Sequence, residues 1–200
     1  MRYGEAVIPG RPRYAIVVAA SFLLALAAAA YGLVHLVQQR DRAPDFALTN
    51  QDGRPFTLSA QSGKVVVLFF GYTHFPDECP TTLAHIAAAV RSLGSSGDEI
   101  EPVFITVDPA RDTITELKAY MTRFGPSFVG LTGPQDALEK TYTDYHVFAQ
   151  NEPSAKNAHG YELVHSSALY YINRAGSLAA YGSSSDGIAA IAAQLRQLSS

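Results

Sequence analysis

Residues 64–90 read KVVVLFFGYTHFPDECPTTLAHIAAAV and join the two patterns that decide the fold. The first part, Lys64–Phe70, is a continuous apolar run rich in β-branched residues, which is typical of a central strand covered on both faces. After a loop that contains two prolines, the apolar residues of Thr81–Leu93 recur at helical spacing, and Pro80 fits the first turn of that helix. The stretch therefore predicts a buried strand that leads through a loop into an amphipathic helix.

The residues after this stretch continue the alternation of strands and helices. Val103–Val107 predicts a second buried strand, and Thr113–Phe124 predicts a second amphipathic helix with Asp112 or Thr113 as its N-cap. Further elements are expected at residues 128–131 (strand), 134–145 (helix) and 188–198 (helix), with β-hairpins over residues 46–58 and 168–181. This order predicts an α/β fold of the thioredoxin-like type, in which helices flank a mixed central β-sheet.

The composition of the 200-residue chain supports a folded domain and excludes several classes of protein. Hydrophobic residues make up 48% and charged residues 16%, which rules out a disordered or fibrous chain. The formal net charge of -3 gives no basic surface for a phosphate backbone, so nucleic acid is not an expected partner. A single cysteine, Cys79, excludes any disulfide within the chain.

The N-terminal part differs from the rest in composition. Ala15–Val37 carries no formal charge and has about the length needed to cross a bilayer. Residues 1–14 hold three arginines and one acidic residue, which favours a cytoplasmic N-terminus and a globular part on the other side. The small residues Ala27–Ala30 leave a cleaved secretory signal open as the alternative to a retained anchor.

These features predict four parts of the chain. Residues 1–14 form a cytoplasmic N-terminus, residues 15–37 a transmembrane anchor or signal segment, residues 38–44 a polar linker and residues 45–200 the globular domain. The thioredoxin-like domain is therefore expected to follow one N-terminal transmembrane helix and to be exported whether that helix is retained or cleaved.

The single cysteine lies where such folds usually carry their chemistry. In sheets with parallel strands, functional groups gather at the carboxyl ends of the strands, and Cys79 follows the predicted strand Lys64–Phe70 at the start of a helix. Backbone N–H groups and the helix dipole favour a thiolate over a thiol at that position. A reactive thiol or a soft metal ligand is therefore the functional interpretation, against the alternative of a small core residue.

Four segments of the chain carry a resemblance to a known family. They are GYTHFPDECPTTL (residues 71–83), VDPARDT (107–113), FVGLTG (128–133) and VHSSALYYINRAG (164–176). In this order and spacing, the chain from about Ala43 to the C-terminus resembles the Sco/SenC family of membrane-anchored copper-binding proteins. The resemblance implies a thioredoxin-like domain that faces the periplasm or the intermembrane space, and for this chain we expect the periplasm and a bacterial-type inner membrane. It also implies a role in delivering copper to the binuclear copper centre of cytochrome c oxidase during assembly of that enzyme.

The resemblance also implies a metal site, and this chain departs from its pattern. The family site combines two cysteines of a C-x-x-x-C loop with a distant histidine. The second cysteine corresponds to Cys79 and the histidine to His165, but the first cysteine corresponds to Phe75. Two thiolates and an imidazole form a soft site suited to Cu(I) and also permit a dithiol–disulfide cycle. Phe75 removes one thiolate and the whole intramolecular redox cycle, so no oxidoreductase turnover is expected.

The remaining ligands predict a weakened copper site. Cys79 and His165 could hold Cu(I) between two ligands, or accept a third ligand from His74, Asp77 or Glu78. Such a site should bind copper more weakly than two cysteines and one histidine, and it could favour a divalent ion over Cu(I). Its expected partner is the oxidase subunit that carries the binuclear copper centre, or another copper protein.

Two further functions remain open on the sequence. A relative without metal would act as an assembly scaffold that recognises a partner protein. A single-cysteine thiol peroxidase is the other alternative, because Cys79 followed by proline and threonine at a helix start also resembles the peroxiredoxins. Those enzymes place a threonine three residues before the reactive cysteine, whereas this chain has Pro76 there.

Two other regions carry structural predictions. The VDPARDT segment contains Asp108, Pro109, Arg111 and Asp112, and it is expected to provide helix capping and an internal pair of Arg111 with a carboxylate. A direct role of this segment in docking a partner is the alternative. The polar connection from His146 to Glu162 is expected to be a long loop and is a candidate surface for a partner protein.

Overall fold

The computed structural model describes residues 20–32, 42–74, 78–157 and 160–199. The chain divides into two compact units, residues 1–41 and residues 42–200. In the first unit residues 20–32 are helical, and the rest of the predicted anchor lies outside the described residues. None of the described helices combines the length and the apolar character that crossing a membrane requires.

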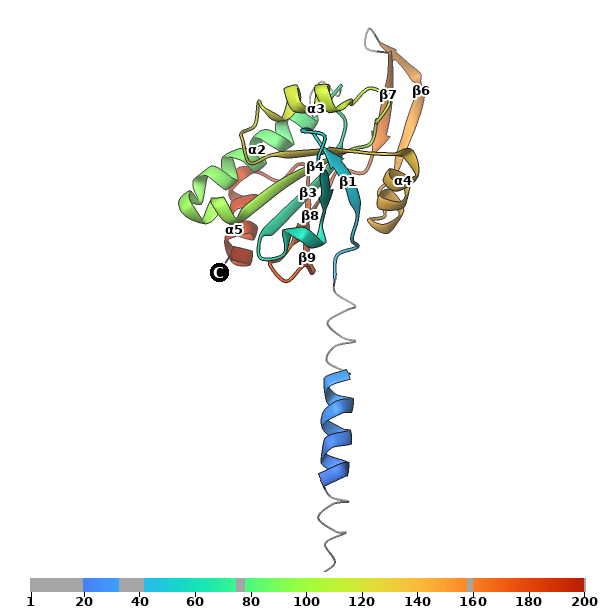
Figure 1. Cartoon of the computed structure of the whole chain (residues 1–200). Coiled ribbons are helices and arrows are strands. Elements are labelled where there is room, and N and C mark those ends of the chain that lie inside the picture. The colour runs from blue at the N-terminus through green and yellow to red at the C-terminus, as the bar shows by residue number, and fades with distance from the viewer. Residues whose placement is uncertain (1–19, 33–41, 75–77, 158–159, 200) are drawn as a thin grey trace, which may run out of the picture. The chain divides into compact units, whose positions relative to one another are not determined.

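The second unit is built on one mixed β-sheet (Figure 1). Its strand order is β2-β1-β5-β4-β3-β8-β9, in which β3, β4 and β5 run parallel and the outer strands pair antiparallel. The strands are β1 (Ala47–Asn50), β2 (Pro55–Thr57), β3 (Val65–Gly71), β4 (Ile100–Thr106), β5 (Val129–Thr132), β8 (Ala168–Ile172) and β9 (Leu178–Ser183). The prediction of a mixed central sheet is confirmed.

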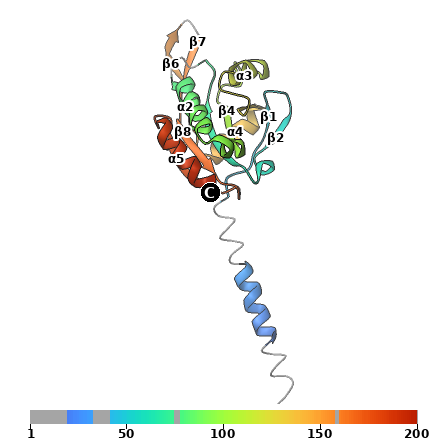
Figure 2. The same ribbon diagram turned by 90° about the vertical axis from the view of Figure 1, so that its left-hand side faces the viewer.

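Helices cover both faces of this sheet. They are α2 (Glu78–Ser92), α3 (Ile114–Met121), α4 (Gln135–Asp144) and α5 (Ile188–Ser199), with short 3-10 helices at Ser59–Gln61 and Gly94–Glu99. Side chains of α2, α3 and α5 belong to one buried cluster, and Leu138 of α4 belongs to the other. Figure 2 shows α2 and α5 lying next to each other in front of the sheet.

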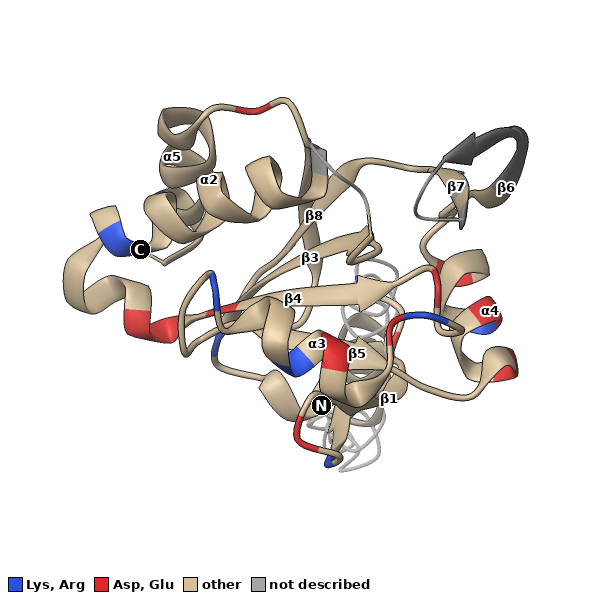
Figure 3. Ribbon diagram, turned by 90° about the horizontal axis from the view of Figure 1, so that it is seen from above, with Lys and Arg blue, Asp and Glu red and all other residues tan. Residues whose placement is uncertain are grey.

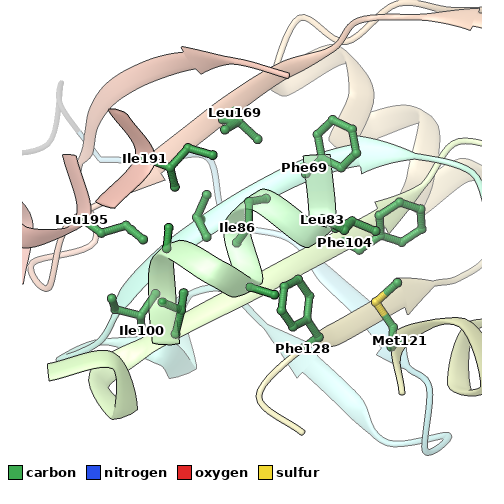
Figure 4. Close-up of a cluster of buried hydrophobic side chains, with 14 of the residues drawn as sticks. Phe69, Leu83, Ile86, Ile100, Phe104, Met121, Phe128, Leu169, Ile191 and Leu195 are labelled. Atoms are coloured by element: carbon green, nitrogen blue, oxygen red, sulfur yellow. The ribbon is translucent and has the colours of Figure 1, made fainter. Parts of the chain in front are cut away.

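The central position of β3 follows from its sequence. All seven of its residues are buried, and successive side chains of a strand point to opposite faces. Val65, Val67 and Phe69 enter the cluster under α2 and α5, whereas the alternate residues enter the cluster on the α4 side. Figure 4 shows Phe69 and Leu83 in the first cluster, and Figure 3 shows that β3 carries no charged residue.

The element boundaries agree with the sequence prediction, with small shifts and one correction. Helix α2 begins before the predicted Thr81, and β4 begins before the predicted Val103. The connection from His146 to Glu162 is not a loop, because it contains β6 (Ala149–Asn157) and the first half of β7 (Gly160–His165). Its polar composition lacks the apolar alternation that predicts a half-buried strand, so the sequence pattern missed this hairpin.

The hairpin of β6 and β7 stands apart from the main sheet (Figure 1). Its two strands pair antiparallel with each other, with Ala149 opposite His165, and form a separate two-stranded sheet. Leu163 is buried and Val164 is exposed, so one face of β7 points toward the domain. Since alternate residues of a strand share a face, His165 is on the same inward face as Leu163.

Candidate metal centre

Cys79 lies where β3 leads into α2. It is the second residue of α2, and its side chain is fully buried in the cluster beneath that helix. Gly71, the last residue of β3, makes this close packing possible, because a Cβ at that position would lie only 2.8 Å from the Cys79 sulfur. The thiol is thus fixed against the end of the central strand, at the carboxyl edge of the parallel strands.

His165 meets this thiol from the end of β7. Its Nε2 lies 3.8 Å from Cys79 Sγ, although the two residues are 86 positions apart in the sequence. Its Nδ1 lies 2.9 Å from the backbone oxygen of Ser166. Because a carbonyl oxygen can only accept a hydrogen bond, Nδ1 carries a proton, and the neutral tautomer with this proton has its lone pair on Nε2. The lone pair of Nε2 therefore faces the sulfur, which is the orientation that a metal ligand needs.

The distance between these two atoms fits one shared metal ion. Metal–sulfur and metal–nitrogen bonds of about 2.3 and 2.0 Å would span about 4.3 Å in a straight line. The observed 3.8 Å instead gives an angle of about 120° at an ion between them. A trigonal site would have one further position for a third ligand, and a thiolate with an imidazole suits a soft ion such as Cu(I).

No third ligand completes this pair within the described part of the chain. Those residues contain no group of three or more histidine, cysteine, aspartate or glutamate side chains that could hold a metal ion. Phe75 and Asp77 lie outside the described residues, as does the side chain of Glu78. His74 is described and does not join Cys79 and His165 in such a group, so a third ligand from His74, Asp77 or Glu78 stays a prediction.

His74 is held by a hydrogen-bond chain. Its Nδ1 lies 3.0 Å from Thr73 Oγ1, which in turn donates to Asp112 Oδ1 at 2.6 Å. Because the threonine hydroxyl uses its proton on the carboxylate, it accepts a hydrogen bond from His74 Nδ1–H. In the neutral tautomer with this proton, the lone pair of the partly exposed histidine lies on Nε2. His74 thus has the tautomer of a ligand but is oriented by Asp112.

Asp112 fastens the loop before Cys79 to the end of β4. Its side chain is fully buried and accepts hydrogen bonds from Thr73 N, Thr73 Oγ1 and Thr106 Oγ1. Burial raises the pKa of this carboxyl group above its ordinary value of 3.8, against the effect of those hydrogen bonds. The N-cap of α3 is Thr113, whose side chain accepts a hydrogen bond from Glu116 N. The sequence analysis did not predict that Asp112 links the loop to the end of β4 by hydrogen bonds.

The predicted pairing of Arg111 with a carboxylate of its own segment is confirmed, and the structure shows that the partner is Asp108. Arg111 Nε donates to Asp108 Oδ2, and both side chains are largely buried. Two aromatic residues that the sequence analysis did not single out join this region. Tyr161 donates from its hydroxyl to Asp108 Oδ1 at 2.6 Å, and Tyr72 lies edge-on to the His165 ring at 5.8 Å.

Fold and site together define a class of protein. A thioredoxin-like domain that presents a buried thiol and an imidazole at the end of its central strand is a candidate soft-metal protein. The SCO1/SenC family model matches residues 35–200, and the chain therefore belongs to the SCO1/SenC family.

Individual relatives agree with this assignment. An SCO2-like protein of Rickettsia conorii is 37% identical over 132 residues, which cover 66% of this chain and 64% of the relative. The mitochondrial protein SCO2 of Saccharomyces cerevisiae is 36% identical over 132 residues, which cover 66% of this chain and 44% of the relative. The matched part of the chain thus spans less than two thirds of the length of these relatives.

Solved structures confirm the predicted thioredoxin-like α/β fold. The structure of Bradyrhizobium japonicum ScoI with copper bound superposes with a TM-score of 0.71 at 34% identity, covering 78% of this chain and 99% of that one. The structure of Arabidopsis thaliana ScoI with copper bound gives a TM-score of 0.70 at 29% identity, covering 78% of this chain and 96% of that one.

Proposed function

We propose that this chain is a copper-binding assembly factor that helps deliver copper to cytochrome c oxidase. The observation that carries the proposal is the 3.8 Å separation of Cys79 Sγ and His165 Nε2. Membership of the SCO1/SenC family supports it, as do the copper-bound structures of the two similar ScoI proteins. Cys79 and His165 are the proposed ligands of Cu(I), and His74 is the proposed candidate for a third position.

The proposed mechanism is ligand exchange. Cu(I) held at about 120° between one thiolate and one imidazole has an open direction, through which a ligand of the acceptor protein can approach. Each new bond to the acceptor can form before a bond to Cys79 or His165 breaks, so the ion need not pass through water. The single cysteine removes the alternative of a dithiol–disulfide cycle inside this chain.

The proposed setting is the periplasmic side of a bacterial-type inner membrane. The uncharged residues 15–37 and the arginines that precede them support a single-pass anchor with a cytoplasmic N-terminus. The proposed partner is the oxidase subunit with the binuclear copper centre, or another copper protein. The net charge of -3 argues against nucleic acid as a partner.

A Cu(I) competition titration tests the proposal. The full chain in mild detergent competes with a chromophoric Cu(I) chelator under reducing conditions, beside Cys79→Ser and His165→Ala. We expect the parent to bind one ion per chain and both variants to bind it much more weakly. His146→Asn is the matched control, because this histidine is exposed and its φ of 54° is one that asparagine tolerates. Equal binding by all four proteins would refute the assignment of the ligands.

A restored cysteine separates this function from the second candidate, a scaffold without metal. The lack of a third ligand among the described residues favours that alternative. Phe75→Cys should tighten Cu(I) binding in a working carrier. Binding in Phe75→Cys but not in the parent would instead support the scaffold. Sulfenic acid at Cys79 after treatment with peroxide, without Cu(I) binding, would point to a thiol peroxidase.

A further inference from the structure

We propose that Arg111 is a positioning residue that holds the strand carrying His165 in register with Cys79. The inference rests on the proposed function for its meaning, since His165 is taken as a copper ligand. Its structural part concerns only how the hairpin of β6 and β7 is attached to the domain.

The hairpin needs such an attachment. Among the described residues, β6 and β7 pair with each other and form no ladder with the seven-stranded sheet. A two-stranded hairpin alone is marginally stable in water, so its position depends on contacts with the domain and on the chain connections at its base. His165 is the last residue of β7, and a displacement of the strand would therefore move the imidazole directly.

Arg111 is linked to β7 at Tyr161 by three interactions. Its Nη1 donates to the backbone oxygen of Tyr161 at 3.1 Å, and its guanidinium carbon lies 3.8 Å from the centre of the Tyr161 ring. The third link runs through Asp108, which accepts from Arg111 on one carboxylate oxygen and from the Tyr161 hydroxyl on the other. Backbone and side chain of one residue are thus both held, which is what fixing a strand requires.

Tyr72 contacts both Arg111 and the part of β7 that carries the imidazole. The Arg111 guanidinium also lies 5.5 Å from the centre of the Tyr72 ring. The Tyr72 hydroxyl accepts a hydrogen bond from Leu163 N at 3.3 Å, and the ring of Tyr72 meets His165 edge-on at an interplanar angle of 82°. Every second residue from Tyr161 to His165 is therefore in contact with Arg111 or Tyr72.

The spacing of these contacts explains how Arg111 acts at a distance. Alternate residues of a strand share one face, so Tyr161, Leu163 and His165 all face the domain. A slip of β7 by one residue would turn this whole face outward. By fixing Tyr161, Arg111 selects the register in which His165 Nε2 points at the sulfur of Cys79.

The first test needs no copper. Long-range ¹H–¹⁵N NMR spectra of the apo full chain report which nitrogen of His165 carries the proton. We expect a pure Nδ1–H tautomer in the parent and an averaged signal in Arg111→Met. In Arg111→Lys, which keeps a positive charge beside Asp108 and so protects the fold, we expect an intermediate signal. A parent-like His165 signal in both folded variants would overturn the proposal, because the short connection to β8 would then be sufficient to fix the imidazole.

The second test measures Cu(I) affinity in the same proteins. Loss of a partner that orients a ligand typically weakens metal binding by about 10- to 100-fold, which is the loss expected for Arg111→Met, with a smaller loss for Arg111→Lys. Arg123→Met is the matched control, since its guanidinium also lies over a tyrosine ring, that of Tyr120, at 5.5 Å. It should leave the affinity within about twofold of the parent.

A double variant distinguishes positioning from general loss of structure. If Arg111 acts through His165, Arg111→Met should add less than about twofold to the loss already caused by His165→Ala. A further loss of tenfold would contradict the proposal. If the parent binds no Cu(I), the proposed function fails, and the tautomer of His165 still decides whether Arg111 positions the imidazole.

Discussion

The glycine at the end of β3 gives the sharpest test of the packing at Cys79. A Cβ at Gly71 would lie 2.8 Å from Cys79 Sγ and 3.0 Å from Phe104 Cε2. Non-bonded heavy atoms prefer separations of about 3.5 to 4.0 Å, so Gly71→Ala requires the sulfur or the strand end to move by about 0.8 Å. Overpacking of this kind lowers the free energy of unfolding by about 1 to 3 kcal/mol.

The same displacement has a larger consequence for the metal site. Cys79 Sγ and His165 Nε2 are 3.8 Å apart. One ion can join a sulfur and a nitrogen only up to about 4.3 Å, the sum of the two bond lengths. Movement of the sulfur away from the imidazole by about 0.8 Å would exceed that limit. We therefore expect Gly71→Ala to weaken Cu(I) binding by at least about tenfold.

Gly130→Ala is the control that separates crowding from damage to the site. A Cβ at Gly130 would lie 2.8 Å from Met121 Cγ, in the same buried cluster but at another strand. Both variants should lower the melting temperature by about 2 to 12 °C, and only Gly71→Ala should lose Cu(I) affinity in the competition titration. Parent-like binding by Gly71→Ala, or an equal loss in Gly130→Ala, would refute the argument from close packing at Cys79.

Three further predictions concern stability. Burial raises the pKa of Asp112, so the folded protein binds this proton more tightly than the unfolded chain, and stability falls as the pH rises from about 4 toward the raised pKa. In urea unfolding, Asp112→Asn should therefore gain stability relative to the parent as the pH rises through this range, and a constant difference would contradict the assignment. Thr113→Ala removes the cap that accepts from Glu116 N and should cost about 1 kcal/mol, measured as a lower urea midpoint. Leu83→Ala leaves a cavity in the buried cluster of Cys79 and should cost about 2 to 5 kcal/mol in the same assay; a loss below 1 kcal/mol would show that the cluster closes over it.

The sequence predicts the central part of the fold because burial on both faces leaves a direct pattern. The run Val65–Phe70 has no polar residue, and a strand between two helical layers is the structure that such a run favours. The hairpin of β6 and β7 leaves no such pattern. Its residues Ala149–Asn157 read AQNEPSAKN, and contacts with distant residues such as Arg111 hold the paired strand β7. Tertiary contacts of this kind have no local signature.

The residues of the candidate site also differ in how far the sequence could predict them. Cys79 could be found from its place after a buried strand, but its pairing with His165 came from resemblance, since no spacing rule links residues 86 positions apart. The role of Asp112 depends on the parallel register of β3 and β4, which places Gly71 beside Thr106. That register brings the residues after both strands together, so Thr73 can reach Asp112. A sequence pattern predicts each strand but not this pairing of the loops.

The two proposed ligands are attached to the domain in different ways, and this difference implies an order of release. Cys79 is packed into a core cluster at the start of α2. His165 is the last residue of β7, which belongs to a hairpin outside the main sheet. We infer that the imidazole leaves copper first and the thiolate last. Tyr161→Phe, which removes the 2.6 Å hydrogen bond to Asp108, should then speed transfer of Cu(I) to a chelator severalfold in stopped-flow measurements. An unchanged transfer rate would contradict this order, because a less firmly held imidazole that leaves first should raise the overall rate.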